Sequence, residues 1–207
     1  MLIAFDNELV PARLAAHCES PEQALNQLNG LMARGEIITG KRTLLEIHQE
    51  LVDEHGLTLN FPAFETAWLE PYHASMAGMR ELIESLSSRH RLVLLSNIDG
   101  FYWPVVRDSQ PELKLFESLF LSFELGLAKP DAEIFRRVCR RTQTLPEQCY
   151  FVDDTRANVN AALAVGFRGH WFRGVDGLIA DLGECGLLQS SVKSGALPLR
   201  EASRRDR

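Results

Sequence analysis

The chain has 207 residues, of which 45% are hydrophobic and 24% charged, the profile of an ordinary globular protein. Its formal net charge of −6 argues against nucleic acid and against an anionic membrane as partners. The N-terminus has no basic export signal and no apolar run reaches the length of a membrane span, so we expect a cytoplasmic protein.

The first third of the chain has the apolar spacing of α-helices. Pro11 opens a periodic run, and Ser20 followed by Pro21 is typical of a helix start. A further helical pattern ends at Gly56, and the stretch FPAFETAWLEPY, residues 61–72, predicts a short helix. We therefore expect residues 11–75 to form a helical insert that packs against the rest of the chain.

From Met76 onward, short apolar runs alternate with helical patterns. The runs are found in RLVLLSN, LFESLFLSF, CYFVDD and GFRGHWF. This alternation predicts an α/β fold in which residues 1–10 and 76–188 form a Rossmann-like parallel sheet with helices on both faces. Residues 189–207 are polar and aperiodic, and we expect them to form a loose tail.

Polar residues with related chemistry follow these segments. Ser96 and Asn97 end one apolar run, and Lys129 stands where we expect the N-cap of a helix. Asp153 and Asp154 end another apolar run. Taken singly, each group has an ordinary explanation as a turn, a helix start or a solvated cap. Because ligands of open α/β sheets bind at the carboxyl ends of the strands, the ordered set indicates a site for a phosphate and Mg²⁺.

The ordered set resembles the haloacid dehalogenase (HAD) superfamily of hydrolases. LVLLSN is similar to the second motif of that family, GLAKPDAEIF to the third, and YFVDDTRANVNAALAVGF to the fourth. The segment between the second and third motifs resembles small bacterial sugar-phosphate phosphatases of the α-glucose-1-phosphate phosphatase type. The stretches RGEI and FETAWLEPY resemble the α-helical cap of that group.

The resemblance implies a Mg²⁺-dependent phosphatase that acts on a small phosphorylated metabolite through an aspartyl-phosphate intermediate. Ser96 and Asn97 would hold the phosphate, and Lys129 would stabilise both the phosphate and an aspartyl nucleophile. Asp153 or Asp154 would bind the Mg²⁺. We expect a monomer or a homodimer, with no nucleic acid and no membrane among its partners.

The first motif of the family, a strand that ends in the nucleophilic aspartate, departs from its usual form here. In one interpretation, Met1–Phe5 is the catalytic strand, Asp6 is the nucleophile and Glu8 is the acid/base, although Pro11 then follows sooner than in relatives. In the other, this stretch corresponds to a segment beyond the first motif. The first catalytic strand is then missing or degenerate, and the protein binds phosphate without turnover. Met1–Phe5 could still enter the resulting gap in the sheet, so Asp6 stays a catalytic candidate.

A third hypothesis, dehalogenation of a haloacid on the same fold without metal, is disfavoured because the aspartate pair would lack a cation. Five aromatic or histidine residues are candidate substrate contacts: Trp68, Tyr72, His73, Tyr102 and Trp103. For the two tryptophans, packing between the helical insert and the sheet is the more ordinary explanation. Asn158 is either a partner that orients the metal-binding carboxylates or an exposed helical residue.

Overall fold

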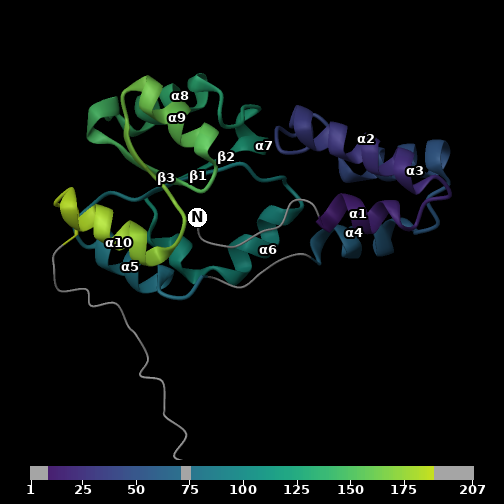
Figure 1. Ribbon diagram of the computed structural model, residues 1–207, viewed down its shortest axis with the longest axis horizontal. Helices are drawn as coiled ribbons and strands as arrows, with labels where there is room; N and C mark the ends of the chain where they lie inside the picture. Colours follow the sequence, from purple (N-terminus) through teal and green to yellow (C-terminus); the bar gives the residue numbers. More distant parts are fainter. Residues whose placement is uncertain (1–8, 71–75, 189–207) are drawn as a thin grey trace, which may run out of the picture.

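The computed structural model describes residues 9–70 and 76–188, and its ribbon divides into a helical group and a group that contains the strands (Figure 1). The helical group consists of α1 (Leu9–Ala15), α2 (Pro21–Arg34), α3 (Leu44–His55) and α4 (Phe61–Leu69). Their buried side chains belong to one apolar cluster. Within the described ranges, no helix combines the length and the apolar composition that crossing a bilayer requires.

Helix α3 illustrates how the sequence encodes these elements. The Thr43 hydroxyl accepts the N–H of Glu46 at 3.2 Å, and the Glu46 carboxylate accepts the N–H of Thr43 at 2.7 Å, so the first turn is capped reciprocally. The helix ends at Gly56, whose φ of 62° is a left-handed conformation that glycine adopts readily. Ile47 and Leu51 lie on its buried face. The predicted end at Gly56 is confirmed.

The second group alternates helices with short strands. Its elements are α5 (Met79–Ser87), β1 (Val93–Ser96), α6 (Tyr102–Ser109), η1 (Pro111–Leu115), β2 (Ser118–Leu121), α7 (Ser122–Leu125), α8 (Ala132–Thr142), η2 (Pro146–Gln148), β3 (Tyr150–Asp153), α9 (Arg156–Val165), β4 (Arg168–Trp171) and α10 (Val175–Glu184). The predicted α/β class is confirmed, in a helix-rich form with short parallel strands.

Helices cover both faces of the strands (Figure 1). Tyr150 and Val152 of β3 pack in the apolar cluster that contains α5 and α10. Phe151, between them in sequence, packs in the cluster that contains α8 and α9. This is the alternation expected of a strand whose successive side chains point to opposite faces.

Within residues 9–70 and 76–188 the strands form two parallel pairs, and Met1–Phe5, the expected first strand, lies outside these ranges. β1 pairs with β2, with Leu95 opposite Phe120, and β3 pairs with β4, with Val152 opposite His170. All four residues of β1 and the first three of β3 are partly exposed, unlike the buried strands in the middle of a parallel sheet. The physical reason is that, in the part of the chain the structure describes, no strand lies between β1 and β3.

Ser122, a fully buried residue directly after β2 and the first of α7, fixes the loop that follows β1. Its hydroxyl accepts the N–H of Ile98 at 2.9 Å and donates to the Ile98 carbonyl at 3.1 Å. Ser122→Ala removes the partner of both backbone groups, so we expect the free energy of unfolding to fall by about 1–3 kcal/mol in urea denaturation. The matched control is Ser88→Ala, at an exposed residue whose hydroxyl bonds the nearby Ser85 carbonyl. An equal loss of unfolding free energy in Ser122→Ala and Ser88→Ala would contradict the role assigned to the Ser122 hydroxyl.

Candidate active site

The five site residues predicted from the sequence that lie within the described ranges line one cavity of about 1120 Å³. Ser96 ends β1 and Asn97 follows it, Asp153 ends β3 and Asp154 follows it, and Lys129 comes from the loop before α8. A smaller hollow of about 290 Å³ between α5 and η1 contains none of these residues. The larger cavity is therefore the candidate site.

The Lys129 ammonium bridges the ends of β1 and β3. Its Nζ donates to the Leu95 carbonyl of β1 at 2.8 Å and to Oδ2 of Asp153 on β3 at 2.7 Å. The side chains of Lys129 and Asp153 are only 8% and 6% exposed, so water screens this ion pair poorly. Buried charge pairs of this kind require further polar partners, which the neighbouring residues supply.

Asn97 holds the backbone of Lys129 in place. Its Nδ2 donates to the Lys129 carbonyl at 2.8 Å, and its Oδ1 accepts the Lys129 N–H at 2.9 Å. The predicted position of Lys129 at a helix N-cap is wrong, because α8 begins at Ala132 and Asp131 is its N-cap. The Asp131 carboxylate accepts the N–H of Glu133 at 2.8 Å, a bond that a lysine side chain cannot make.

Asp153 is held as an anion by three donors. Its Oδ1 accepts the N–H of Thr155 and the amide of Asn158, both at 2.9 Å, while its Oδ2 accepts Lys129. Burial alone would raise the pKa of Asp153, but the Lys129 charge and these hydrogen bonds outweigh it and bring the pKa below its ordinary value. Asn158 is itself buried, so of its two predicted roles the structure excludes the exposed one.

Ser96 and Asp154 are less constrained. Neither side chain has a hydrogen-bond or ion-pair partner within residues 9–70 and 76–188, and Asp154 is exposed. Mg²⁺ takes oxygen ligands from one or two carboxylates and completes its shell with water and phosphate. The described residues contain no cluster of three or more metal-ligating side chains. The adjacent carboxylates of Asp153 and Asp154 therefore fit a Mg²⁺ that draws its remaining ligands from water and substrate.

Some predicted residues fall outside this geometry, and one buried carboxylate was not predicted. Asp6, Tyr72 and His73 lie outside the described residues. Asp99, three residues after β1, accepts the N–H groups of Phe101 and Tyr102 at 2.8 Å and the Trp68 indole N–H at 3.5 Å. Burial raises the pKa of Asp99 although these hydrogen bonds oppose the change. Its place two residues after Asn97, at the end of the same apolar run, was the available signal in the sequence.

The chain belongs to the haloacid dehalogenase-like hydrolase family, whose model matches residues 5–166. A D-ribitol-5-phosphate phosphatase of Bacteroides thetaiotaomicron is 28% identical over 138 residues, which are 64% of this chain and 67% of that protein. Flavin mononucleotide hydrolase 1 of Arabidopsis thaliana is 27% identical over 157 residues, which are 72% of this chain and 64% of that protein. The matches thus span about two thirds of the length of these two relatives.

A solved structure of similar fold is a HAD family enzyme of Bacteroides thetaiotaomicron in complex with magnesium and inorganic phosphate. Its TM-score is 0.70 at 23% sequence identity, over 82% of this chain and 87% of that one. At this identity the similarity establishes the shared α/β fold.

The contribution of the Lys129–Asp153 pair to stability should depend on pH. Because the pKa of Asp153 in the fold lies below its ordinary value of 3.8, the contribution is complete above about pH 4 and is lost as the pH falls through the lowered pKa. Asp153→Asn should therefore lower the free energy of unfolding at pH 7 by about 3–5 kcal/mol, the cost of unpairing a buried charge. Below about pH 4 this deficit relative to the unsubstituted chain should shrink.

Urea denaturation between pH 7 and pH 3, in buffer with EDTA to exclude metal effects, measures this deficit. The matched control is Asp154→Asn at the exposed neighbour, which should change stability little at any pH. A deficit for Asp153→Asn that stays constant across the pH range would contradict the lowered pKa of Asp153.

Proposed function

We propose that this protein is a Mg²⁺-dependent phosphatase that hydrolyses a phosphate monoester of a small metabolite. The observation that carries the proposal is the Lys129 ammonium, held between β1 and β3 beside an aspartate pair at a cavity of about 1120 Å³. The names of the two relatives state that they hydrolyse ribitol 5-phosphate and flavin mononucleotide, and the solved HAD enzyme holds magnesium with inorganic phosphate.

The residues at the strand ends divide the work of binding a phosphate ester. The Ser96 hydroxyl and the backbone N–H of Asn97 would donate hydrogen bonds to phosphate oxygens, and Lys129 would neutralise part of the phosphate charge. Asp154, whose carboxylate has no partner among the described residues, and Asp153 would hold the Mg²⁺. When bound, the Mg²⁺ supplies positive charge that offsets the charge on the transferring phosphoryl group.

Asp6 is the proposed nucleophile. Val10, in the first turn of α1 and four residues after Asp6 in the sequence, lines the same cavity as Lys129. Attack of the Asp6 carboxylate on phosphorus would break the ester bond, with Glu8 giving a proton to the leaving alcohol oxygen. Water would then hydrolyse the aspartyl-phosphate and release inorganic phosphate. Lys129 would stabilise the negative charge in both steps.

The alternative function is phosphate binding without turnover. One observation favours it: α1 already begins at Leu9, three residues after Asp6 in the sequence, and this short spacing disfavours the interpretation of Met1–Phe5 as the catalytic strand. This alternative predicts that the chain binds inorganic phosphate and releases none from an ester.

Phosphate release from p-nitrophenyl phosphate with Mg²⁺ tests the phosphatase proposal. Lys129→Ala should lower kcat/KM by about 10²–10³-fold, because it removes one preorganised charge from the transition state. Asp6→Asn should remove turnover while inorganic phosphate still binds in calorimetry. Circular dichroism checks that both proteins are folded. If the unsubstituted chain then releases phosphate no faster than Lys129→Ala, the phosphatase proposal is rejected. Calorimetry with inorganic phosphate then tests the alternative, binding without turnover.

The metal requirement has a separate test. EDTA should abolish turnover and added Mg²⁺ should restore it. Asp154→Asn should raise the Mg²⁺ concentration for half-maximal activity by about tenfold or more, since it removes a charged ligand without disturbing the Lys129–Asp153 pair. Asp176→Asn, on α10 outside the cavity lining, is the control and should leave the Mg²⁺ titration unchanged. Identical titrations for the two variants would exclude Asp154 as a ligand.

A further inference from the structure

We infer that the substrate of this site is a phosphate monoester of an apolar alcohol, whose apolar part lies against the helical group α1–α4. This inference rests on the proposed phosphatase function and narrows it from small metabolites in general to esters with a hydrophobic leaving group. Two features of the helical group lead to it: the composition of the wall that this group gives to the cavity, and the direction of its charged side chains.

The wall that the helical group contributes to the cavity is apolar. Six described residues of this group line it, and none of them carries a charge or a hydroxyl: Val10, Met32, Ala33, Ile37, Ile38 and Trp68. Met32, Ala33 and Ile38 are partly or fully exposed, so they present apolar surface that a ligand can cover. Trp103 of α6, also partly exposed, adds an aromatic side chain to the same cavity.

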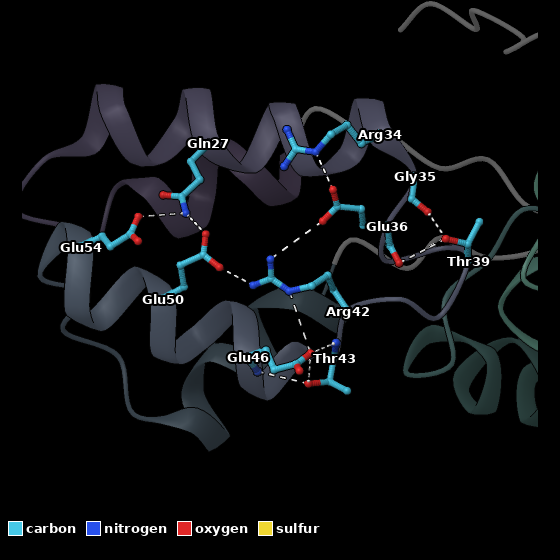
Figure 2. A network of polar contacts seen from close by, with 10 residues as sticks. All are labelled: Gln27, Arg34, Gly35, Glu36, Thr39, Arg42, Thr43, Glu46, Glu50 and Glu54. Atoms are coloured by element: carbon cyan, nitrogen blue, oxygen red, sulfur yellow. Dashed lines mark hydrogen bonds and ion pairs between the residues drawn. The ribbon is translucent and has the colours of Figure 1, made fainter.

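The charged residues of the adjoining segment satisfy one another, as Figure 2 shows for α2, α3 and the loop between them. Arg34 donates to the Glu36 carboxylate at 2.6 Å. Arg42 lies 3.9 Å from the same carboxylate and also pairs with Glu50, which in turn accepts a hydrogen bond from Gln27. None of these five residues lines the cavity. Glu36 and Arg42 of the loop are therefore engaged in this network, while Ile37 and Ile38 between them line the cavity.

A close contact with the strand-containing group fixes this loop. Gly40 has a φ of 69°, and a Cβ there would lie 2.9 Å from the Phe123 carbonyl oxygen of α7, so the approach requires glycine. Two residues earlier, Ile38 lines the cavity. This backbone contact therefore helps to set the position of the apolar wall relative to the strand-containing group.

The wall discriminates between two kinds of leaving group. A sugar or polyol would bring hydroxyls against these side chains, where each hydroxyl loses water without gaining a partner. An alkyl or aryl group gains free energy when it leaves water for the same surface. Because Ser96, Lys129 and Asp154 line the cavity as well, one ligand can place its phosphate on these polar residues and its apolar part on the wall.

A series of n-alkyl phosphates from ethyl to octyl, below their micelle concentrations, tests the inference with the full chain and Mg²⁺. We expect kcat/KM to rise by about twofold to fourfold for each added methylene until the wall is covered, fourfold being the equivalent of about 0.8 kcal/mol per buried methylene. Hexyl phosphate should be a better substrate than glucose 1-phosphate or ribitol 5-phosphate. A flat series or a preference for the sugar phosphates, with turnover of p-nitrophenyl phosphate retained, would overturn the inference and leave the phosphatase function standing.

A pair of variants tests whether the rise of kcat/KM with chain length arises at the apolar wall. Ile38→Gln places an amide on the apolar surface and should flatten the dependence of kcat/KM on chain length. Leu45→Gln is the matched control, because Leu45 belongs to α3 in the same helical group, is 57% exposed and does not line the cavity. In Leu45→Gln, kcat/KM should depend on chain length as it does in the unsubstituted chain. If kcat/KM in Ile38→Gln still rises with chain length as steeply as in the unsubstituted chain, the inference that the wall binds the apolar part is contradicted.

Binding measurements test the apolar wall independently of hydrolysis. Calorimetry with methyl-, butyl- and octylphosphonate, which cannot be hydrolysed at phosphorus, measures the affinity for the apolar part without turnover. A Kd that falls with chain length supports the wall even if no ester is hydrolysed and the phosphatase proposal has failed. Equal Kd values for methyl- and octylphosphonate would overturn the inference.

Discussion

The ammonium of Lys129 is the contact on which the rest of the site depends, because it lies where the two strand pairs meet. Among the described residues no strand joins β1 to β3, so the backbone ladders that hold a parallel sheet together stop at these two edges. Lys129 spans the edges through the Leu95 carbonyl and the Asp153 carboxylate. Burying this charge costs desolvation energy, which the hydrogen bonds of Thr155 and Asn158 to the same carboxylate help to offset.

The same contacts prepare the site for an anion. Asn97 fixes the backbone of Lys129 on both sides of the residue, and Leu95 and Asp153 fix its ammonium. A positive charge that is already oriented needs little reorganisation when negative charge arrives, which is the condition under which electrostatic stabilisation is largest. Under the proposed function, the Lys129 side chain would therefore contribute both to the stability of the fold and to the chemistry.

The sequence predicted which side chains meet, because residues that follow the apolar runs of parallel strands must converge at a common edge. It did not predict how they are partnered. The phosphate role predicted for Asn97 uses its backbone N–H, and the structure adds that its side chain clamps Lys129 through two side-chain-to-backbone hydrogen bonds, which no spacing rule reveals. Asp131 displaced Lys129 as the N-cap because its carboxylate can accept an N–H of the first turn, whereas a lysine ammonium has no acceptor atom. The role of Asp99 depends on Trp68, 31 residues earlier, and a contact of that range has no local signal.

The polar and apolar parts of the cavity are supported by different contacts. Lys129 and Asn97 take their positions from β1, β3 and each other, whereas the wall at Ile38 takes its position from α2, α3 and the approach of Gly40 to α7. Substitutions in the wall can therefore change which alcohol fits without moving the ammonium. Asp99 is the exception, because its carboxylate accepts Trp68 from the wall and two N–H groups from the segment that opens α6. A change at that buried carboxylate would therefore disturb Trp68 in the wall and the first turn of α6 together, because one side chain is the acceptor for both.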